Sequence, residues 1–541
     1  MQNRTVVFKW IAIGTVILFF LMLEIAARIF MHVDQRESRS IDMGKLSFFS
    51  RITVKGEPSV RITNKYGYAD QLTTFKERKS PGTFRIFCLG GSACAGWPHP
   101  AGERFSAYLD TCLRKIYTGT SIEMINCGAH GFASYRVREV FHQLIPYQPD
   151  AIIVWSGNNE FLEDQRFKTS KIQSVIHALA QRVKIVQLIK SALPNTKLNG
   201  NEPEVAGSFW KKVQQQSLEL CSNPDLFRKV NQGYEQSIEG IIHEAKENGI
   251  KVLLLTVPVN LRDWQPNVSR NLLSGNDSLL WSKMYNLGCN NLENNDFKNA
   301  QHCFEKAINR EPHHAMSYFM LASCFEEMND SLLALRNYTL AKDLDCNPFR
   351  AISGFNEIIR ETAVNNPDVN LFDAEATFRR YARKGIPGFD LFLDYVHPTK
   401  KGNLILASEL AEYIRENDLF KMGKSPTKID VAMLKTFFPE YSDETDVSLQ
   451  LTRYSLCCLT HQYKSAIQIG TTILNSLLYG HQENNNNKHE FAKLKDGIQC
   501  FSMLLNIEKH RHKGVVNLNE EKLALVARQN FYKAYYPYGT Y

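Results

Sequence analysis

The stretch Phe84 to Pro98 (FRIFCLGGSACAGWP) constrains the fold more than any other part of the 541-residue chain. A short apolar segment runs into two glycines and a serine, and a third glycine follows before a helical pattern begins. This order predicts a strand, a tight turn and a helix. Two glycines allow positive φ angles that a residue with a Cβ resists, so Ser92 can be presented at the carboxyl edge of a sheet.

Ser92 is a candidate nucleophile, although the same turn has other interpretations. A phosphate-binding loop needs Gly-Lys-Ser/Thr, whereas Gly96 is followed here by Trp97 and Pro98. The glycine spacing of a dinucleotide-binding fingerprint is absent as well. An ordinary glycine-rich turn between a strand and a helix therefore remains as the alternative to a nucleophile.

From Phe84 onward, short apolar runs alternate with helical patterns, which predicts an α/β fold with a parallel sheet buried on both faces. Strands are expected at 84–89, 122–126, 151–155, 252–257 and 369–372. Helices are expected at about 105–117, 135–144, 225–248 and 399–415. Residues 165–225 have no clear place in this alternation.

Between the fourth and fifth predicted strands, the sequence repeats with an offset of 34 residues. Leu287, Ala300, Phe304 and Ala307 recur as Leu321, Ala334, Tyr338 and Ala341. The pattern resembles the tetratricopeptide repeat over 281–314 and 315–348, with an amphipathic stretch at 350–362 as a cap. Asn291 and Cys346 depart from it, since an aromatic residue and a proline are usual there. An unrelated pair of helical hairpins is the alternative.

The amino-terminal segment 5–31 is largely apolar, and its stretch 10–23 carries no charge. One membrane-spanning helix is expected if flanking Lys and Arg side chains reach the interface, although Glu24 fits poorly. A cleaved signal peptide is the alternative, but no clear small-x-small cleavage site follows. Arg4 and Lys9 predict a cytoplasmic amino end. The sequence thus predicts a single-pass signal-anchor, with the rest of the chain in the periplasm or the extracellular space.

Composition argues against several classes of function. The net charge of +8 arises without a long basic run, so nucleic acid is not an expected partner. The 12 cysteines form no CxxC or Cys/His ligand pattern, which predicts neither a metal site nor a regular disulfide framework. No cofactor is expected. Cysteines within predicted strands and repeats are expected to be buried thiols, namely Cys88, Cys127, Cys289, Cys303, Cys324 and Cys346.

Four polar segments follow predicted strands or open the last helix, so we expect them at the same edge of the sheet. They are Gly90-Gly91-Ser92, 126–131 (NCGAHG), 156–160 (SGNNE) and 394–398 (DYVHP). Acyl transfer from an ester needs a nucleophile, a base that also acts as an acid, a group that orients the base, and donors to the oxyanion. The four segments contain a suitable residue for each role.

These segments resemble the sequence blocks of the SGNH (GDSL-type) hydrolase superfamily, whose members act on lipids, small esters and O-acylated sugars. The resemblance implies that Ser92 is the nucleophile and that its backbone N–H is one oxyanion donor. Gly131 would donate through its backbone N–H and Asn159 through its side-chain amide. His397 would be the base that Asp394 orients. The implied fold is a flavodoxin-like three-layer α/β/α sandwich of strand order 2-1-3-4-5, with the repeats inserted between its fourth and fifth strands.

Two of the segments depart from the family pattern. The first has Gly-Gly-Ser in place of Gly-Asp-Ser, and the third has Glu160 where Asp is commoner. Neither change removes a catalytic group, but both leave the substrate preference open. His130 is a further candidate for the cleft because it precedes Gly131. Arg262 and Asp263, which follow the fourth predicted strand, are candidates for substrate contact.

The expected function is that of a membrane-anchored serine esterase that hydrolyses an acyl ester, such as O-acetyl, of a glycan, a lipid or a small alcohol. An acyltransferase with the same site is one alternative. A non-catalytic scaffold, whose hydrolase-like domain only binds ligand, is the other. A protein partner is expected for the repeats, because such arrays present concave surfaces to peptides and helices.

The length of the chain predicts several domains. The amino-terminal anchor is followed by a polar linker that contains a short extended piece near 60–67. Beyond the closing helix, helical patterns continue without a clear 34-residue register. The expected boundaries are an anchor at 5–31, a linker at 32–80, a hydrolase domain at 81–278 and 349–420, tetratricopeptide repeats at 281–348, and a carboxyl-terminal helical region at 425–541.

Overall fold

The computed structural model describes residues 48–62, 73–162, 220–221, 223–422, 447–460 and 462–480. These residues all belong to one compact unit, Ser47–Glu163 together with Phe209–Tyr541. The expected anchor at 5–31 and most of the carboxyl-terminal region lie outside the described residues. Among the helices that are described, none has both the length and the apolar character needed to span a bilayer.

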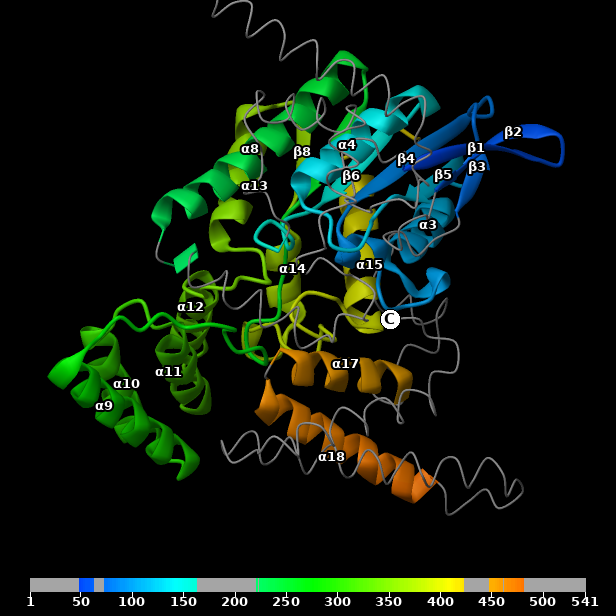
Figure 1. Ribbon diagram of the computed structural model, residues 1–541. Coiled ribbons are helices and arrows are strands. Elements are labelled where there is room, and N and C mark those ends of the chain that lie inside the picture. The colour runs from blue at the N-terminus through cyan, green and yellow to red at the C-terminus, as the bar shows by residue number, and fades with distance from the viewer. Residues whose placement is uncertain are drawn as a thin grey trace, which may run out of the picture. The chain divides into compact units, whose positions relative to one another are not determined.

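A parallel sheet of five strands forms the centre of the described unit (Figure 1). Its spatial order is β5-β4-β6-β7-β8, which is the 2-1-3-4-5 order that the family resemblance implies. β6 is buried along its whole length, as expected for a central strand covered on both faces. The strands are β4 (Thr83–Gly90), β5 (Ser121–Asn126), β6 (Ala151–Trp155), β7 (Lys251–Leu255) and β8 (Val369–Phe372).

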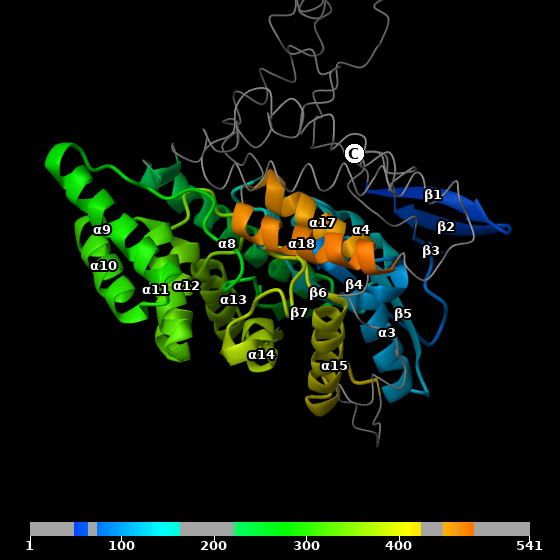
Figure 2. The ribbon, with the colours of Figure 1, turned by 90° about the horizontal axis from the view of Figure 1, so that it is seen from below.

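Helices cover both faces of this sheet (Figure 2). On one side α3 (Phe105–Ile116) packs on α15 (Lys400–Glu416), and on the other α4 (Ser134–Leu144) packs on α8 (Pro224–Glu247). α13 (Ser353–Asn365) also packs on α8. Each helix turns an apolar stripe inward; in α3 this stripe follows helical spacing and comprises Phe105, Tyr108, Leu109, Cys112, Leu113 and Ile116.

The expected linker is partly a second sheet. β1 (Phe49–Val54), β2 (Glu57–Ile62) and β3 (Thr74–Lys76) form an antiparallel sheet in the order β1-β2-β3. Phe75 of β3 lies 5.7 Å from the Phe87 ring of the central sheet, measured between ring centroids. Of the predicted linker 32–80, the described residues therefore belong to the hydrolase-like unit, and their extended piece is longer than expected.

Four helices occupy the predicted repeat region: α9 (Gly275–Glu293), α10 (Phe297–Arg310), α11 (Ala315–Glu327) and α12 (Ser331–Asp343). They form two hairpins, α9 with α10 and α11 with α12, and α10 also packs on α11 (Figure 2). The two hairpin turns are alike, because Asn295 and Asn329 both have positive φ angles, of 60° and 63°. Asp296 and Asp330 then cap the second helix of each pair. Assignment of these helices to the tetratricopeptide family stays a prediction.

In the carboxyl-terminal region, the described helices are α17 (Val447–Leu459) and α18 (Tyr463–Gly480), which pack on each other. α17 contacts the segment before Asp394 through Arg453. Its guanidinium donates to the carbonyl oxygen of Leu393 at 2.7 Å and to that of Phe392 at 3.0 Å. This region therefore supports the chain immediately before Asp394.

One disulfide corrects the expectation for Cys346. Cys346 is bonded to Cys221, which lies 125 residues earlier in the chain. No local spacing marks such a pair, because the connectivity of distant cysteines is set by the tertiary fold. Cys88 and Cys127 are free and buried, and burial raises the pKa of both thiols. In the described ranges no group of three or more His, Cys, Asp and Glu side chains could hold a metal ion.

Candidate active site

The turn after β4 carries Ser92 as the first residue of a short helix, α2 (Ser92–Ala95). Its two glycines are needed for close approach, not for the positive φ that the sequence suggested. A Cβ on Gly90 would lie 2.0 Å from the carbonyl oxygen of Trp155. Gly91 is extended, with φ −83° and ψ −159°. Only the third glycine, Gly96, has a positive φ, of 84°.

Gly91 takes the place of the Asp in Gly-Asp-Ser and lies against the Asn159 amide. A Cβ at this position would lie 2.4 Å from Nδ2 of Asn159 and 3.3 Å from the carbonyl oxygen of Phe132. Any side chain here would have to displace the Asn159 amide. The loops that contain Asn159 and Gly131 therefore lie directly against the nucleophile turn.

Ser92, His397 and Asp394 form one continuous hydrogen-bonded chain. His397 Nε2 lies 2.8 Å from Ser92 Oγ, and His397 Nδ1 lies 2.5 Å from Asp394 Oδ2. Asp394 is fully buried and His397 is 4% exposed. With Nδ1–H donating to the carboxylate, Nε2 is left as an acceptor for the Ser92 hydroxyl.

The second carboxylate oxygen of Asp394 is also occupied. Asp394 Oδ1 accepts backbone N–H bonds from Val396 and His397, each at 2.8 Å. Asn260, in the loop after β7, donates from Nδ2 to the backbone carbonyl of Asp394 at 2.9 Å. The carboxylate and its backbone are thus held separately, so that Oδ2 is directed at the imidazole.

A second contact ties the His397 segment to the nucleophile turn. His99 Nε2 lies 2.8 Å from the carbonyl oxygen of Pro398, so this nitrogen carries the proton and donates. In the same turn, the Trp97 ring meets the His397 ring edge-on at 4.7 Å between centroids. His99 is 1% exposed, and burial lowers its pKa from 6.5 to about 4, although the bond to Pro398 acts in the opposite direction.

The lowered pKa of His99 predicts a pH dependence of folding. Between about pH 6.5 and pH 4 the unfolded chain binds a proton at His99 that the folded chain does not bind, so stability falls as the pH falls. The loss from this group is on the order of 3 kcal/mol across that window. In His99→Gln we expect this part of the pH dependence to disappear. Urea unfolding from pH 4 to 8 measures the free energy of unfolding of both proteins. If this free energy depends on pH in the same way in the wild type and in His99→Gln, the prediction is contradicted.

The two other expected oxyanion donors lie on neighbouring loops. Asn159 donates from Nδ2 to the carbonyl oxygen of Phe132 at 3.1 Å, and the same amide has a second N–H to offer. Gly131, one residue before Phe132, has a positive φ of 71°. Glu160 is fully buried and accepts from the backbone N–H and the hydroxyl of Ser134, both at 2.8 Å. It therefore joins the third segment to the first turn of α4.

His130 lies near the site through an aromatic contact. Its ring is 6.1 Å from that of Trp97, which itself contacts His397. His130 is partly exposed. A role for His130 in the cleft stays a prediction.

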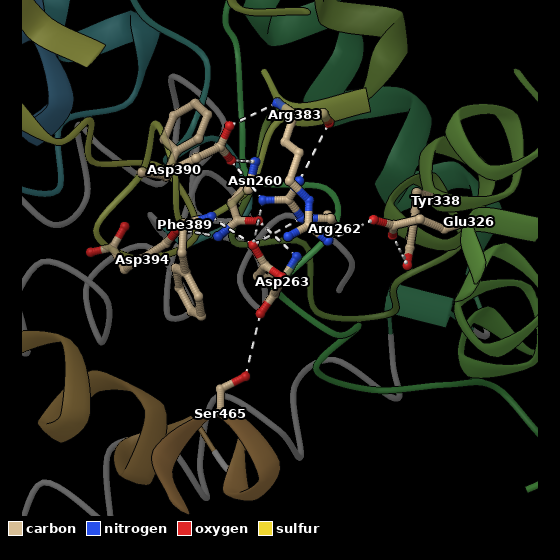
Figure 3. A network of polar contacts seen from close by, with 12 residues as sticks. Asn260, Arg262, Asp263, Glu326, Tyr338, Arg383, Phe389, Asp390, Asp394 and Ser465 are labelled. Atoms are coloured by element: carbon tan, nitrogen blue, oxygen red, sulfur yellow. Dashed lines mark hydrogen bonds and ion pairs between the residues drawn. The ribbon is translucent and has the colours of Figure 1, made fainter. Parts of the chain in front are cut away.

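Arg262 and Asp263 do not fit the suggested role in substrate contact. Figure 3 shows both in an internal network of polar contacts. Arg262 donates to Asp390 at 2.7 Å, and Asp263 accepts the backbone N–H of Phe389 at 2.7 Å. The Asp263 carbonyl oxygen accepts from Ser465 of α18 at 3.4 Å. These residues join the loop after β7 to the segment 383–390 and to α18.

Comparisons with known proteins give matches only among solved structures. No family profile and no curated protein sequence match the chain. The acetylxylan esterase Axe2 from Geobacillus stearothermophilus is 13% identical, with 62% of this chain and 93% of that chain covered and a TM-score of 0.28. A GDSL-like lipase from Bacteroides thetaiotaomicron is 12% identical over 62% and 88%, with a TM-score of 0.27. The SGNH-hydrolase family esterase AlinE4 is 17% identical over 33% and 62%, with a TM-score of 0.19.

The matching structures include proteins described as GDSL-family or SGNH-hydrolase family members and an acetylxylan esterase. At TM-scores this low the likenesses add no weight to any particular function. What the chain itself shows is a parallel sheet of order 2-1-3-4-5 with a hydrogen-bonded Ser–His–Asp chain at its carboxyl edge. In this combination a hydroxyl, an imidazole and a carboxylate lie in the order that nucleophilic catalysis by a serine requires.

Proposed function

We propose that this protein is a serine esterase that hydrolyses an acyl ester, such as an O-acetyl group, of a glycan or a lipid. The observation that carries the proposal is the contact between Ser92 Oγ and His397 Nε2 at 2.8 Å, across 305 residues of sequence. A serine hydroxyl is a weak nucleophile at neutral pH, and it needs an adjacent base that is itself oriented. The contacts of His397 with Ser92 and with Asp394 support these two roles.

The reaction follows from these positions. His397 Nε2 takes the proton of Ser92 Oγ as that oxygen bonds to the ester carbonyl carbon, and Asp394 stabilises the resulting imidazolium. The negative oxygen of the tetrahedral intermediate accepts from the Ser92 and Gly131 N–H groups and from the Asn159 amide. His397 then returns the proton to the leaving alkoxide. Water repeats the cycle on the acyl-enzyme and releases the acid.

Two aromatic rings support a glycan as the alcohol part of the substrate. The leaving oxygen receives its proton from His397, so the alcohol must lie next to this imidazole. Trp97 and Tyr395 are partly exposed and meet the His397 ring at 4.7 Å and 6.0 Å between centroids. Such rings offer a broad apolar surface to the C–H face of a sugar.

The compartment and the partner belong to the same proposal. Residues 5–31 would anchor the protein and place the catalytic domain outside the cytoplasm. The Cys221–Cys346 disulfide supports this location, because disulfides persist in oxidising compartments. We take α9 to α12 as tetratricopeptide repeats that bind a protein partner. Asp296 and Asp330 cap equivalent helices and are separated by the same offset as the repeats. This equivalence supports the assignment of α9 to α12 as tetratricopeptide repeats.

Reaction with a fluorophosphonate probe tests the proposed function most directly. We expect one labelled residue, Ser92, because only an activated serine attacks such a phosphorus centre. Peptide mapping of the labelled full-length protein identifies the site. Labelling at another serine, or none at all, would contradict the proposal.

With an acetylated oligosaccharide as substrate, release of free acetate indicates a hydrolase, whereas transfer of the acetyl group to a second sugar indicates the acyltransferase.

A further inference from the structure

The segment 344–352, called here the return segment, connects α12 to α13 and leads the chain from the inserted helices back to the sheet. It contacts both halves of the candidate active site. At one end, the backbone N–H of Ala351 donates to Asn158 Oδ1 at 3.0 Å. Asn158 is the residue before Asn159, the expected oxyanion donor.

The return segment also contacts the half that holds Asp394. Arg350 donates from Nη1 to the carbonyl oxygens of Asn260 and Trp264, at 2.7 Å and 2.8 Å. Asn260 is fully buried and in turn donates to the Asp394 carbonyl at 2.9 Å, while its backbone N–H donates to the Tyr395 carbonyl at 3.0 Å. Figure 3 shows Asn260 beside Asp394. Two consecutive residues, Arg350 and Ala351, therefore support the two loops that must meet around one ester.

Arg350 is an unusual residue for a purely structural contact. It is 2% exposed, and its Nη2 makes no hydrogen bond within the described residues. Burial lowers its pKa to about 10, although nearby Asp345 acts in the opposite direction. A buried charge without a hydrogen-bonded counterion lowers stability, and apolar replacements of buried ionic groups are often neutral or stabilising. The guanidinium is therefore held in place for its two bonds to the carbonyl oxygens of Asn260 and Trp264.

The return segment is itself fixed at its other end. Asp345 accepts the backbone N–H groups of Asn267, Val268 and Asn347, at 2.8, 3.0 and 2.9 Å. Cys346 donates from its backbone to the Val268 carbonyl at 2.9 Å and is bonded to Cys221 through the disulfide. The return segment is therefore held in place at the base of the helical insertion, and this in turn fixes the positions of Arg350 and Ala351 beside the active site.

We propose that Arg350 is a positioning residue: through the return segment it holds the Asn158–Asn159 loop and the Asp394–His397 loop in register for acyl transfer. The helical insertion is then part of the active-site framework and not an independent module. This inference rests on the proposed esterase function. It assigns Arg350 no contact with the substrate.

Arg350→Met, in the full-length protein, tests this role. We expect kcat for a small acetyl ester to fall about 10- to 100-fold with KM changed little, because a displacement near 1 Å at the reacting groups costs rate more than binding. Arg350→Lys, which keeps a charged donor on a side chain one bond shorter, should lie between Arg350→Met and the wild type. Arg360→Met is the matched control: it removes a guanidinium from nearby α13 that pairs with Asp373 and Glu375. Its kcat should stay at the wild-type value.

A merely structural role for Arg350 makes a different prediction. Fluorophosphonate titration counts competent active sites, so kcat is expressed per labelled Ser92. We expect both Arg350→Met and Asp345→Asn/Arg350→Met to unfold below the wild-type Tm, because buried backbone groups lose hydrogen-bond partners, and kcat per labelled site to stay low in both at temperatures where they are folded. The proposal would be overturned if kcat per labelled site were unchanged in Arg350→Met and in Asp345→Asn/Arg350→Met. It would also be overturned if the fall in kcat only reflected a smaller fraction of folded protein. If the wild type itself neither labels nor turns over an ester, the proposed function fails first and this inference fails with it.

Discussion

Ser92→Ala is expected to lower kcat/KM for a small acetyl ester by about 10⁴- to 10⁶-fold. The change removes the atom that attacks the carbonyl carbon, while His397 and the oxyanion donors stay in place. No other described serine hydroxyl lies within hydrogen-bonding distance of His397 Nε2, whose contact with Ser92 Oγ is 2.8 Å. Residual turnover would come only from substrate binding and the oxyanion donors. Initial rates with acetyl esters, at matched concentrations of folded protein, measure the effect.

Ser237→Ala is the matched control for this experiment. Ser237 is also buried, and its hydroxyl donates to the Gly233 carbonyl one turn earlier in α8, at 2.7 Å. The same atom is lost, so a general effect of serine removal would appear in both variants. Turnover that is undiminished in Ser92→Ala would show that this residue is not the nucleophile.

The central sheet could be predicted from the sequence because its strands are buried on both faces. β6 reads AIIVW and β7 reads KVLLL, so neither needs the polar alternation of a half-exposed strand. Once these strands are parallel, their carboxyl ends share one edge, and the polar segments that follow them must meet there. This consequence brings the segments of Ser92, Gly131 and Asn159 together, whereas His397 reaches the same edge from the segment just before α15.

The small sheet β1-β2-β3 has no continuous apolar run like those of β6 and β7. Its buried residues Phe49, Val60 and Phe75 are far apart in the sequence and lie among polar neighbours. Each strand gains its burial from tertiary contacts, such as that of Phe75 with Phe87. Strand preference depends strongly on such context, and the sequence pattern therefore indicates only a polar segment with one short extended piece near 60–67.

The residues that support the triad were missed for a different reason. His99, Asn260 and Arg350 all bond to backbone carbonyl oxygens. Every residue offers such a carbonyl, so no pairing of residue types marks the contact. The Cys221–Cys346 disulfide is similar, because it joins positions that only the folded chain brings together. Catalytic residues leave a motif, whereas the residues that position them do not.

Asp394→Asn is the second large effect we expect, with a fall in kcat of about 10⁴-fold at neutral pH. The reason lies in the two oxygens of Asp394. Oδ1 accepts the backbone N–H groups of Val396 and His397, each at 2.8 Å. In the variant this position still requires an acceptor, so the asparagine carbonyl oxygen takes it and the amide NH₂ faces His397 Nδ1.

His397 must then change its tautomer. Nδ1 becomes the acceptor, the proton moves to Nε2, and Nε2 can no longer take the proton of Ser92. The variant should keep its fold and its KM. Asp390→Asn is the control, since that carboxylate also accepts backbone N–H bonds, from Arg383 and Gly388, but bonds to Arg262 and not to a histidine. A similar loss of kcat in both variants, or none in Asp394→Asn, would mean that orientation of His397 by Asp394 does not determine the rate.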